Sequence, residues 1–350
     1  MSNMKIIALF GACKARWRRW PKIIRIFSTT VAASVFAITL WGSLSLQQLD
    51  SVLLKGDSRL YTVAKGAKAK DVLMQLASEP VSSFWSVIWL KIHPEFSQIK
   101  AGTYKIEKGW NVKHALQVFV SGKEAVFSVT LVEGQRIEDW LVTLSKAPYL
   151  EQPLTPDDLI SLRSEFNIEQ DNIEGWFLPE TYSYTVGTTS REILRRAHAD
   201  MKSYLDKNWK NRDKSLPYAS AYDALIMASI IEKETAQATE RPRIASVFVN
   251  RLNKKMKLQT DPTVIYGVKD RYDGNIRRSD LEDDNPYNTY VINGLPPTPI
   301  AMPSKAAIKA ALHPDKTNYL YFVAKGGGAH KFSTSLAEHN NAVKRYVLEQ

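Results

Sequence analysis

Two glutamates near the end of one predicted helix are the residues best suited to acid–base chemistry. The segment 221–237 reads AYDALIMASIIEKETAQ and carries Glu232 and Glu234. Side chains two residues apart on a helix point about 200° away from each other, so the two carboxyl groups cannot face one cleft. Glu234 shares an apolar flank with Met227 and Ile230, and an apolar flank and a helix C-terminus both disfavour the ionised carboxyl. We predict Glu234 as a proton donor, with Glu232 as the fallback. On spacing alone, both could instead be ordinary solvent-facing glutamates.

Three further segments have the composition of binding loops. The segment 174–184, EGWFLPETYSY, combines aromatic residues and carboxylates without a helical or strand period, which predicts a loop. Aromatic faces can stack on sugar rings, although a structural aromatic anchor would have the same composition. Segment 257–267 is followed by segment 287–304, whose Pro-Pro and Gly-Leu-Pro stretches predict rigid loops that suit a groove for an extended polymer.

The absence of several motifs narrows the chemistry. The chain has no GxSxG, no phosphate-binding GxxxxGK[ST] and no HExxH, and its six histidines have no metal-ligand spacing. The single cysteine, Cys13, excludes disulfide frameworks and cysteine-based metal sites. If the protein is an enzyme, the expected chemistry rests on carboxylates, with no cofactor and no metal.

The overall composition is that of a globular protein. Of 350 residues, 44% are hydrophobic and 24% are charged, which excludes a disordered chain and a multi-span membrane protein. The net charge is +11, but seven lysines and arginines lie within residues 1–25, before the first acidic residue. The other residues therefore carry only +4, and no nucleic-acid partner is predicted.

An uncharged stretch follows this basic leader. Residues 26–46 are long enough to cross a bilayer as a helix, and the positive charges before them predict a cytoplasmic N-terminus. A cleavable signal peptide, a lipoprotein signal ending at Cys13 and a buried core helix are the alternatives. We expect a retained single-pass anchor.

A weak repeat follows the predicted anchor. Segments beginning at Tyr61, Tyr104 and Val129 each combine a short strand pattern, a glycine and an amphipathic helix pattern. The first two, with a helix around 84–92, could form a small module that loosely resembles LysM-type peptidoglycan-binding modules. A spacer above the membrane is the alternative.

These observations predict an α+β protein in four parts. They are a basic cytoplasmic leader (1–25), a transmembrane helix (26–46), a LysM-like α+β module (50–125) and a mixed α+β catalytic domain (126–350).

Seven short motifs, in order behind the predicted anchor, carry a specific resemblance. EGWFLPETY, ASIIEKET, VFVNRL, LQTDPTVIYG, YNTY, GLPP and AMPS resemble the endolytic murein transglycosylase (MltG/YceG-like) family. The resemblance covers residues 50–345 and is most specific in 174–334. It implies non-hydrolytic, internal cleavage of peptidoglycan glycan strands and a LysM-like region after the anchor.

The resemblance also implies site residues. The family's catalytic glutamate lies in the helix ending EKET, and Glu234-Thr235 matches the Glu-Ser of other lytic transglycosylases. The implied product has a 1,6-anhydromuramic acid end. Candidate saccharide-binding residues are Gln259, Asp261, Tyr287, Asn288, Thr289 and, more weakly, Glu180.

Two other functions are compatible with the same residues: a muramidase-type hydrolase in which Asp261 activates water, and a non-catalytic glycan-binding scaffold. For the transglycosylase, the implied partners are peptidoglycan glycan strands, the membrane and peptidoglycan synthases. The implied location is the bacterial inner membrane, with the catalytic domain in the periplasm and a role in terminating or trimming nascent strands.

Overall fold

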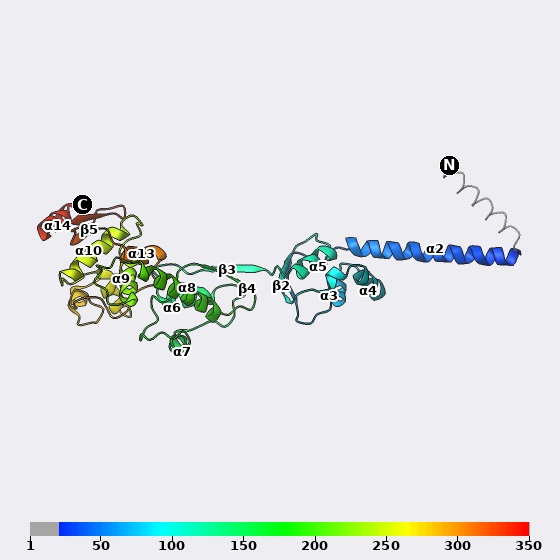
Figure 1. The fold of residues 1–350 in the computed structure, drawn as a ribbon, viewed down its shortest axis with the longest axis horizontal. Coiled ribbons are helices and arrows are strands. Elements are labelled where there is room, and N and C mark those ends of the chain that lie inside the picture. The colour runs from blue at the N-terminus through cyan, green and yellow to red at the C-terminus, as the bar shows by residue number, and fades with distance from the viewer. Residues whose placement is uncertain (1–20, 350) are drawn as a thin grey trace. The chain divides into compact units, whose positions relative to one another are not determined.

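The computed structural model describes residues 21–349 and divides into two compact units, Met1–Ala125 and Val126–Gln350 (Figure 1). Most of the basic leader and Cys13 lie outside the described residues. The mixture of short strands and many helices confirms the α+β class.

The first unit begins with the long helix α2 (Lys22–Ser51), which contains the predicted span 26–46. Among the described residues, it is the one helix long and apolar enough to cross a membrane. Its last turns contribute Leu49 to the core of the unit, so the helix continues into the folded module without a linker. The other elements of this unit are β1 (Arg59–Val63), α3 (Ala69–Leu76), α4 (Ser83–Ile92), η1 (Pro94–Ser97), β2 (Gly102–Ile106) and α5 (Val112–Ser121).

The predicted repeat is confirmed as a structural unit. Each copy has a strand, a glycine and a helix, and Gly66, Gly109 and Gly134 adopt φ values of 81°, 86° and 73°. Positive φ is readily accessible to glycine, so the turn needs this residue. The strands of the first two copies, β1 and β2, pair antiparallel. The third copy belongs to the second unit.

The second unit contains two small antiparallel sheets and most of the helices. Its strands are β3 (Val126–Thr130), β4 (Thr181–Thr185), β5 (Tyr321–Ala324) and β6 (His330–Ser333), with β3 paired to β4 and β5 to β6. Its helices are α6 (Ile137–Ser145), η2 (Pro156–Asp158), α7 (Leu159–Glu165), α8 (Ser190–Lys210), α9 (Ala221–Glu234), α10 (Arg241–Asn253), α11 (Asp261–Gly267), α12 (Arg278–Glu282), α13 (Lys305–Leu312), α14 (Leu336–Val343) and η3 (Lys344–Leu348).

One predicted loop is partly a strand. Residues 181–185, at the end of the aromatic segment, form β4, so the loop prediction is wrong for them. Tyr182 and Tyr184 are buried while Thr181 and Ser183 are exposed, which is the alternation of a strand with one buried face. The neighbouring aromatic and proline residues concealed this short period in the sequence.

Candidate active site

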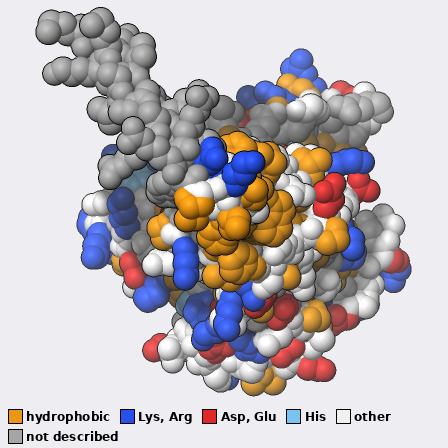
Figure 2. Space-filling model, turned by 90° about the vertical axis from the view of Figure 1, so that its right-hand side faces the viewer, with side chains coloured by type: hydrophobic (Ala, Val, Ile, Leu, Met, Phe, Trp, Pro, Cys, Tyr) orange, Lys and Arg blue, Asp and Glu red, His pale blue; other side chains and the backbone are white. Residues whose placement is uncertain are grey.

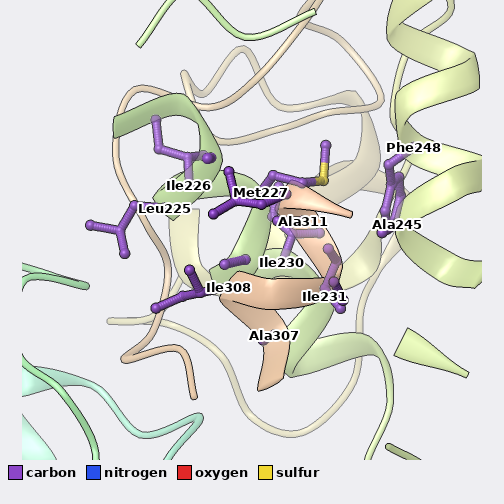
Figure 3. Close-up of a cluster of buried hydrophobic side chains, with 14 of the residues drawn as sticks. Leu225, Ile226, Met227, Ile230, Ile231, Ala245, Phe248, Ala307, Ile308 and Ala311 are labelled. Carbon is purple, nitrogen blue, oxygen red and sulfur yellow. The ribbon is translucent and has the colours of Figure 1, made fainter. Parts of the chain in front are cut away.

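Helix α9 passes through the middle of the second unit's main core. Its residues from Ala224 to Glu232 are all buried, and a helix that is apolar on every side requires packing partners all around it. In Figure 3, side chains of α9 lie in one cluster with Ala307, Ile308 and Ala311 of α13 and with Ala245 and Phe248 of α10. Ser220 and Asp223 form a capping box at its start. The end of α9 is therefore held in a fixed position.

Glu234 is the last residue of α9, and its carboxyl group lies in a cleft. Thr235 adopts an extended conformation and ends the helix there. The hydroxyl of Thr260 donates a hydrogen bond to Oε1 of Glu234. Burial raises the pKa of Glu234 to about 7, against the hydrogen bond from Thr260, which lowers it; the nearby charge of Asp261 adds to the rise. Glu234 can therefore exist in both protonation states near neutral pH.

The pKa of Glu234 is raised, in the direction predicted from the sequence. Met227, Ile230 and Ile231 are buried in the core cluster. Burial is nevertheless the largest influence on the Glu234 carboxyl, so the predicted direction of the shift agrees with the structure.

The cleft around Glu234 has a volume of about 350 Å³ and is assembled from segments far apart in the sequence. It is lined by Glu234, Arg251, Leu258, Gln259, Asp261, Tyr290, Tyr321, Phe322, Leu336 and His339. Polar groups and aromatic rings are thus exposed on the same walls, which is the combination that sugar rings require.

Arg251 brings a positive charge to this cleft. Its guanidinium donates to the carbonyl oxygens of Leu320 and Leu258, at 2.6 and 2.9 Å, and to Oε1 of Gln259 at 3.2 Å. These acceptors are neutral, so the charge of Arg251 is available to favour the ionised form of Glu234.

Asp261 and Gln259, which also line the cleft, are held in place as well. Oδ1 of Asp261 accepts a hydrogen bond of 2.6 Å from the hydroxyl of Tyr290. Gln259 has a left-handed backbone with φ of 50°, and its N–H donates to the carbonyl of Thr289 at 3.1 Å. A non-glycine residue rarely adopts this conformation, and such strain is commonly found at functional sites.

Glu232 lies in a different environment. Its Oε1 accepts from Arg241 at 3.0 Å, and its Oε2 accepts from the N–H of Ser304 at 2.8 Å and from the Ser304 hydroxyl. Both side chains of the Glu232–Arg241 ion pair are largely shielded from solvent. Glu232 therefore ties the end of α9 to α10 and to the start of α13, outside the cleft that contains Glu234.

Of the predicted saccharide-binding residues, only Gln259 and Asp261 line the cleft. Asn288 and Thr289 are buried, and their side chains bond within the chain: Asn288 donates to three carbonyl groups, and Thr289 accepts from the N–H of Thr260. Tyr287 bonds the hydroxyl of Thr298. These residues build the scaffold beneath the cleft, and Thr289 positions the threonine that contacts Glu234.

Glu180 and the rest of the aromatic segment 174–184 lie outside the Glu234 cleft. Glu180 forms an ion pair of 3.0 Å with Lys305 away from the cleft. Phe177 is fully buried in a core cluster and does not line the cleft. Glu174 is buried as well, and desolvation raises its pKa to about 8, but it accepts from the N–H of Ile137 at the start of α6. The aromatic segment is therefore mainly a structural element in this structure.

Several cleft residues were missing from the sequence prediction. Arg251 and Tyr290 belong to the motifs VFVNRL and YNTY, but nothing in the sequence indicates which member of a motif reaches the cleft. Tyr321 and His339 stack at 5.1 Å and lie in the C-terminal segment. Among residues 21–349, no group of three or more His, Cys, Asp or Glu side chains could hold a metal ion.

Comparisons with known proteins match this chain to one group of related proteins. A model of the YceG-like family matches residues 61–345. A protein named endolytic murein transglycosylase from Bacillus subtilis (strain 168) is 36% identical over 276 residues, which cover 72% of this chain and 74% of that protein.

A protein of the same name from Streptococcus pneumoniae (strain D39) is 26% identical over 290 residues. This alignment covers 73% of the present chain and 52% of the streptococcal protein, so the chain matches about half of that relative's length. A crystal structure described as a yceG-like protein from Listeria monocytogenes superimposes with a TM-score of 0.51 at 26% identity, covering 82% of this chain and 99% of that one.

Proposed function

The chain belongs to the YceG-like family, and from this premise we propose that it cleaves peptidoglycan glycan strands internally, with Glu234 as the catalytic acid. It is a lytic murein transglycosylase, the activity named for its relatives. The observation that carries the residue assignment is the carboxyl group of Glu234, held in a polar and aromatic cleft with a pKa near 7.

In the first step, protonated Glu234 donates its proton to the glycosidic oxygen between N-acetylmuramic acid and N-acetylglucosamine. The bond to the leaving sugar breaks while positive charge develops at C1 of the muramic acid. The carboxylate that forms is stabilised by the hydroxyl of Thr260 and the charge of Arg251.

In the second step, the Glu234 carboxylate accepts the proton of the C6 hydroxyl of the same muramic acid, and the C6 oxygen attacks C1. Attack within one ring has the entropic advantage of a tethered nucleophile. The product carries a 1,6-anhydromuramic acid end, and Glu234 regains the proton it began with. No second catalytic carboxylate is required.

The hydrolase alternative has one specific observation in its favour. Asp261 lies in the same cleft as Glu234, so a second carboxylate is present that could activate water. Its Oδ1 is bonded to the Tyr290 hydroxyl, an arrangement that favours a role in orienting substrate over proton abstraction. The mass of the product distinguishes the two reactions.

Internal cleavage has a direct test. Purified, uniformly long glycan strands are incubated with the enzyme, and the length distribution is followed by chromatography. Endolytic cleavage produces strands of intermediate length from the start. Progressive release of disaccharides from one end, with the remaining strands shortening slowly, would contradict the proposal.

The activity should fall as the pH rises above neutrality. The acid must be protonated in the free enzyme, and a carboxyl with a pKa of about 7 loses its proton as the pH rises through that value. We expect kcat/KM to be nearly constant at mildly acidic pH and to decrease about tenfold per pH unit well above pH 7. A pH–rate profile on soluble glycan strands measures this limb.

The Thr260→Val variant identifies the group that titrates. Removing the hydroxyl that stabilises the carboxylate raises the pKa of Glu234 further, so the descending limb should move to higher pH. The matched control is Thr130→Val, which removes a β3 hydroxyl that bonds the hydroxyl of Thr181 on β4. If the descending limb lies at the same pH in both variants and in the parent protein, the titrating group is not Glu234.

The domain organisation remains a proposal as well. We propose that residues 126–350 form the catalytic domain and that residues 50–125 form a LysM-like module that binds glycan. The supporting observation is that every residue lining the Glu234 cleft lies after residue 125.

A protein that begins at Ala125 keeps β3 intact and should still cleave soluble glycan strands at a rate close to that of the full chain. A fragment of residues 47–125, which lacks the uncharged stretch but keeps the core residue Leu49, should co-sediment with peptidoglycan without cleaving it. Loss of cleavage by a folded 125–350 protein, as judged by circular dichroism, would contradict the domain proposal.

The anchor gives a prediction about topology. We propose that α2 spans the bacterial inner membrane once, with the N-terminus in the cytoplasm and the catalytic domain in the periplasm. A reporter fused after residue 58, beyond α2, should be active only if it is of a type that works outside the cytoplasm. Activity of a cytoplasmic reporter at this site would contradict the orientation. In this location the enzyme would terminate or trim nascent strands beside peptidoglycan synthases.

A further inference from the structure

Helix α4 exposes its apolar side chains. Phe84, Val87 and Ile92 are 65%, 40% and 57% exposed, whereas Ser86 and Trp89 are 0% and 1% exposed. Trp89 packs in the core of the unit, so α4 has an apolar inner face and an apolar exposed face, whereas a surface helix of a soluble domain usually exposes polar side chains. The exposed stripe needs an apolar partner.

Helix α4 packs directly against the proposed membrane anchor. The Trp85 ring meets the Trp41 ring edge-on at a centroid distance of 5.4 Å. It also covers Gly42, where an added Cβ would lie only 2.8 Å from the ring. Gly42 is one of two buried residues of α2 and provides the space for this contact.

The contact fixes the depth of α4 relative to the bilayer. Gly42 precedes Leu46, the end of the uncharged stretch, by four residues, or about 6 Å along a helix axis. A helix that packs against this level of α2 lies at the membrane–water boundary. Tryptophan is enriched at this boundary, where Trp41 and Trp85 both lie.

The chemistry of α4 also fits a lipid surface. Its only charged residue is Lys91, which lies on the same exposed face, one turn after Val87 and near the end of the helix. A lysine in this position can extend its ammonium group to lipid headgroups while its methylene groups stay among the apolar side chains. Figure 2 views the molecule from the side on which α2 begins and shows hydrophobic side chains gathered there, with lysine and arginine side chains at the margin. The exposed apolar residues of α4 therefore belong to the helix that packs against the anchor.

We propose that α4 is a second membrane contact, which inserts Phe84, Val87 and Ile92 into the outer interface of the bilayer beside α2. The proposal rests on the membrane anchoring proposed above. Because α2 continues into the module without a linker, a second contact through α4 would hold the first unit in one orientation on the membrane surface.

Single fluorescent labels test this insertion in the full chain. Cys13→Ser removes the only cysteine, and Val87→Cys, Val35→Cys or Lys105→Cys then introduces one labelling site each. Val35 lies within α2 and Lys105 in β2, at the end of the module away from the start of α2 (Figure 1). The labelled proteins are reconstituted in phosphatidylethanolamine–phosphatidylglycerol bilayers and quenched either by lipids with a spin label on the acyl chain or by aqueous iodide.

We expect the labels at positions 87 and 35 to lose most of their emission to the lipid quencher and little to iodide, and the label at 105 to show the opposite. If the lipid quencher acts on the label at position 35 while the label at 87 behaves like the one at 105, the anchor proposal holds and the α4 proposal is wrong. If iodide also quenches the label at position 35, both the proposed anchor and the α4 contact are wrong. Protection of 87 from both quenchers would mean that a protein surface covers α4, and this also overturns the proposal.

Discussion

Replacing Glu234 by glutamine is expected to reduce the formation of anhydro product by at least about 10²-fold, to the background of the assay. Glutamine keeps the shape of the side chain and can accept the hydrogen bond from Thr260, but it has no proton to transfer. General acid–base catalysis typically contributes about 10²–10⁴-fold, and Glu234 supplies both the acid and the base step in the proposed mechanism. The release of soluble muropeptides from purified sacculi measures the loss.

The same variant should remain folded. Because the pKa of Glu234 is raised, the folded protein binds this proton more tightly than the unfolded chain does. The contribution of Glu234 to the stability of the folded protein therefore decreases as the pH rises from about 4.5 to about 7. Glutamine removes that loss, so the melting temperature at pH 8 should be equal to or higher than that of the parent. An active Glu234→Gln variant would exclude Glu234 as the acid.

Replacing Glu232 by glutamine should affect stability far more than chemistry. The change leaves Arg241 buried without its anionic partner and weakens the link to Ser304 at the start of α13. Removal of one partner of a buried ion pair typically costs about 3–5 kcal/mol. For a unit of this size we expect the melting temperature to fall by roughly 10 °C. Differential scanning calorimetry measures the change.

Glu234→Gln is the matched control, since it makes the same chemical change two residues away on the same helix. Below its melting temperature, the Glu232→Gln protein should retain most of the parent's kcat. If it instead melts normally and is inactive, Glu232 is the acid and the assignment of the two glutamates is reversed.

The sequence predicted the parts of the structure that depend on local patterns. The uncharged stretch 26–46 lies within α2, and each of the three predicted strand–glycine–helix patterns forms a strand, a turn at glycine and a helix. The opposite orientation of residues two apart on a helix also agrees with the separate environments of Glu232 and Glu234. These features follow from backbone geometry, which depends on neighbouring residues.

The rest of the site depends on contacts between distant segments. Arg251 and Tyr321 reach the cleft from a helix and a strand that local periodicity cannot bring together. Asn288 and Thr289 have side chains suited to binding sugars, but their burial leaves them to satisfy backbone groups and to position Thr260. A polar side chain in a motif looks the same in a sequence whether it touches substrate or supports a residue that does.

The mass of the products formed in heavy-oxygen water tests the central claim most directly. Transglycosylation joins C1 of the muramic acid to its own C6 oxygen and uses no water. The new muramic acid ends should therefore be lighter than hydrolysed ends by one water molecule and should contain no heavy oxygen. Glu234→Gln should yield neither product. New reducing ends that carry one heavy oxygen, formed by the purified parent protein, would contradict the account and assign the reaction to a hydrolase.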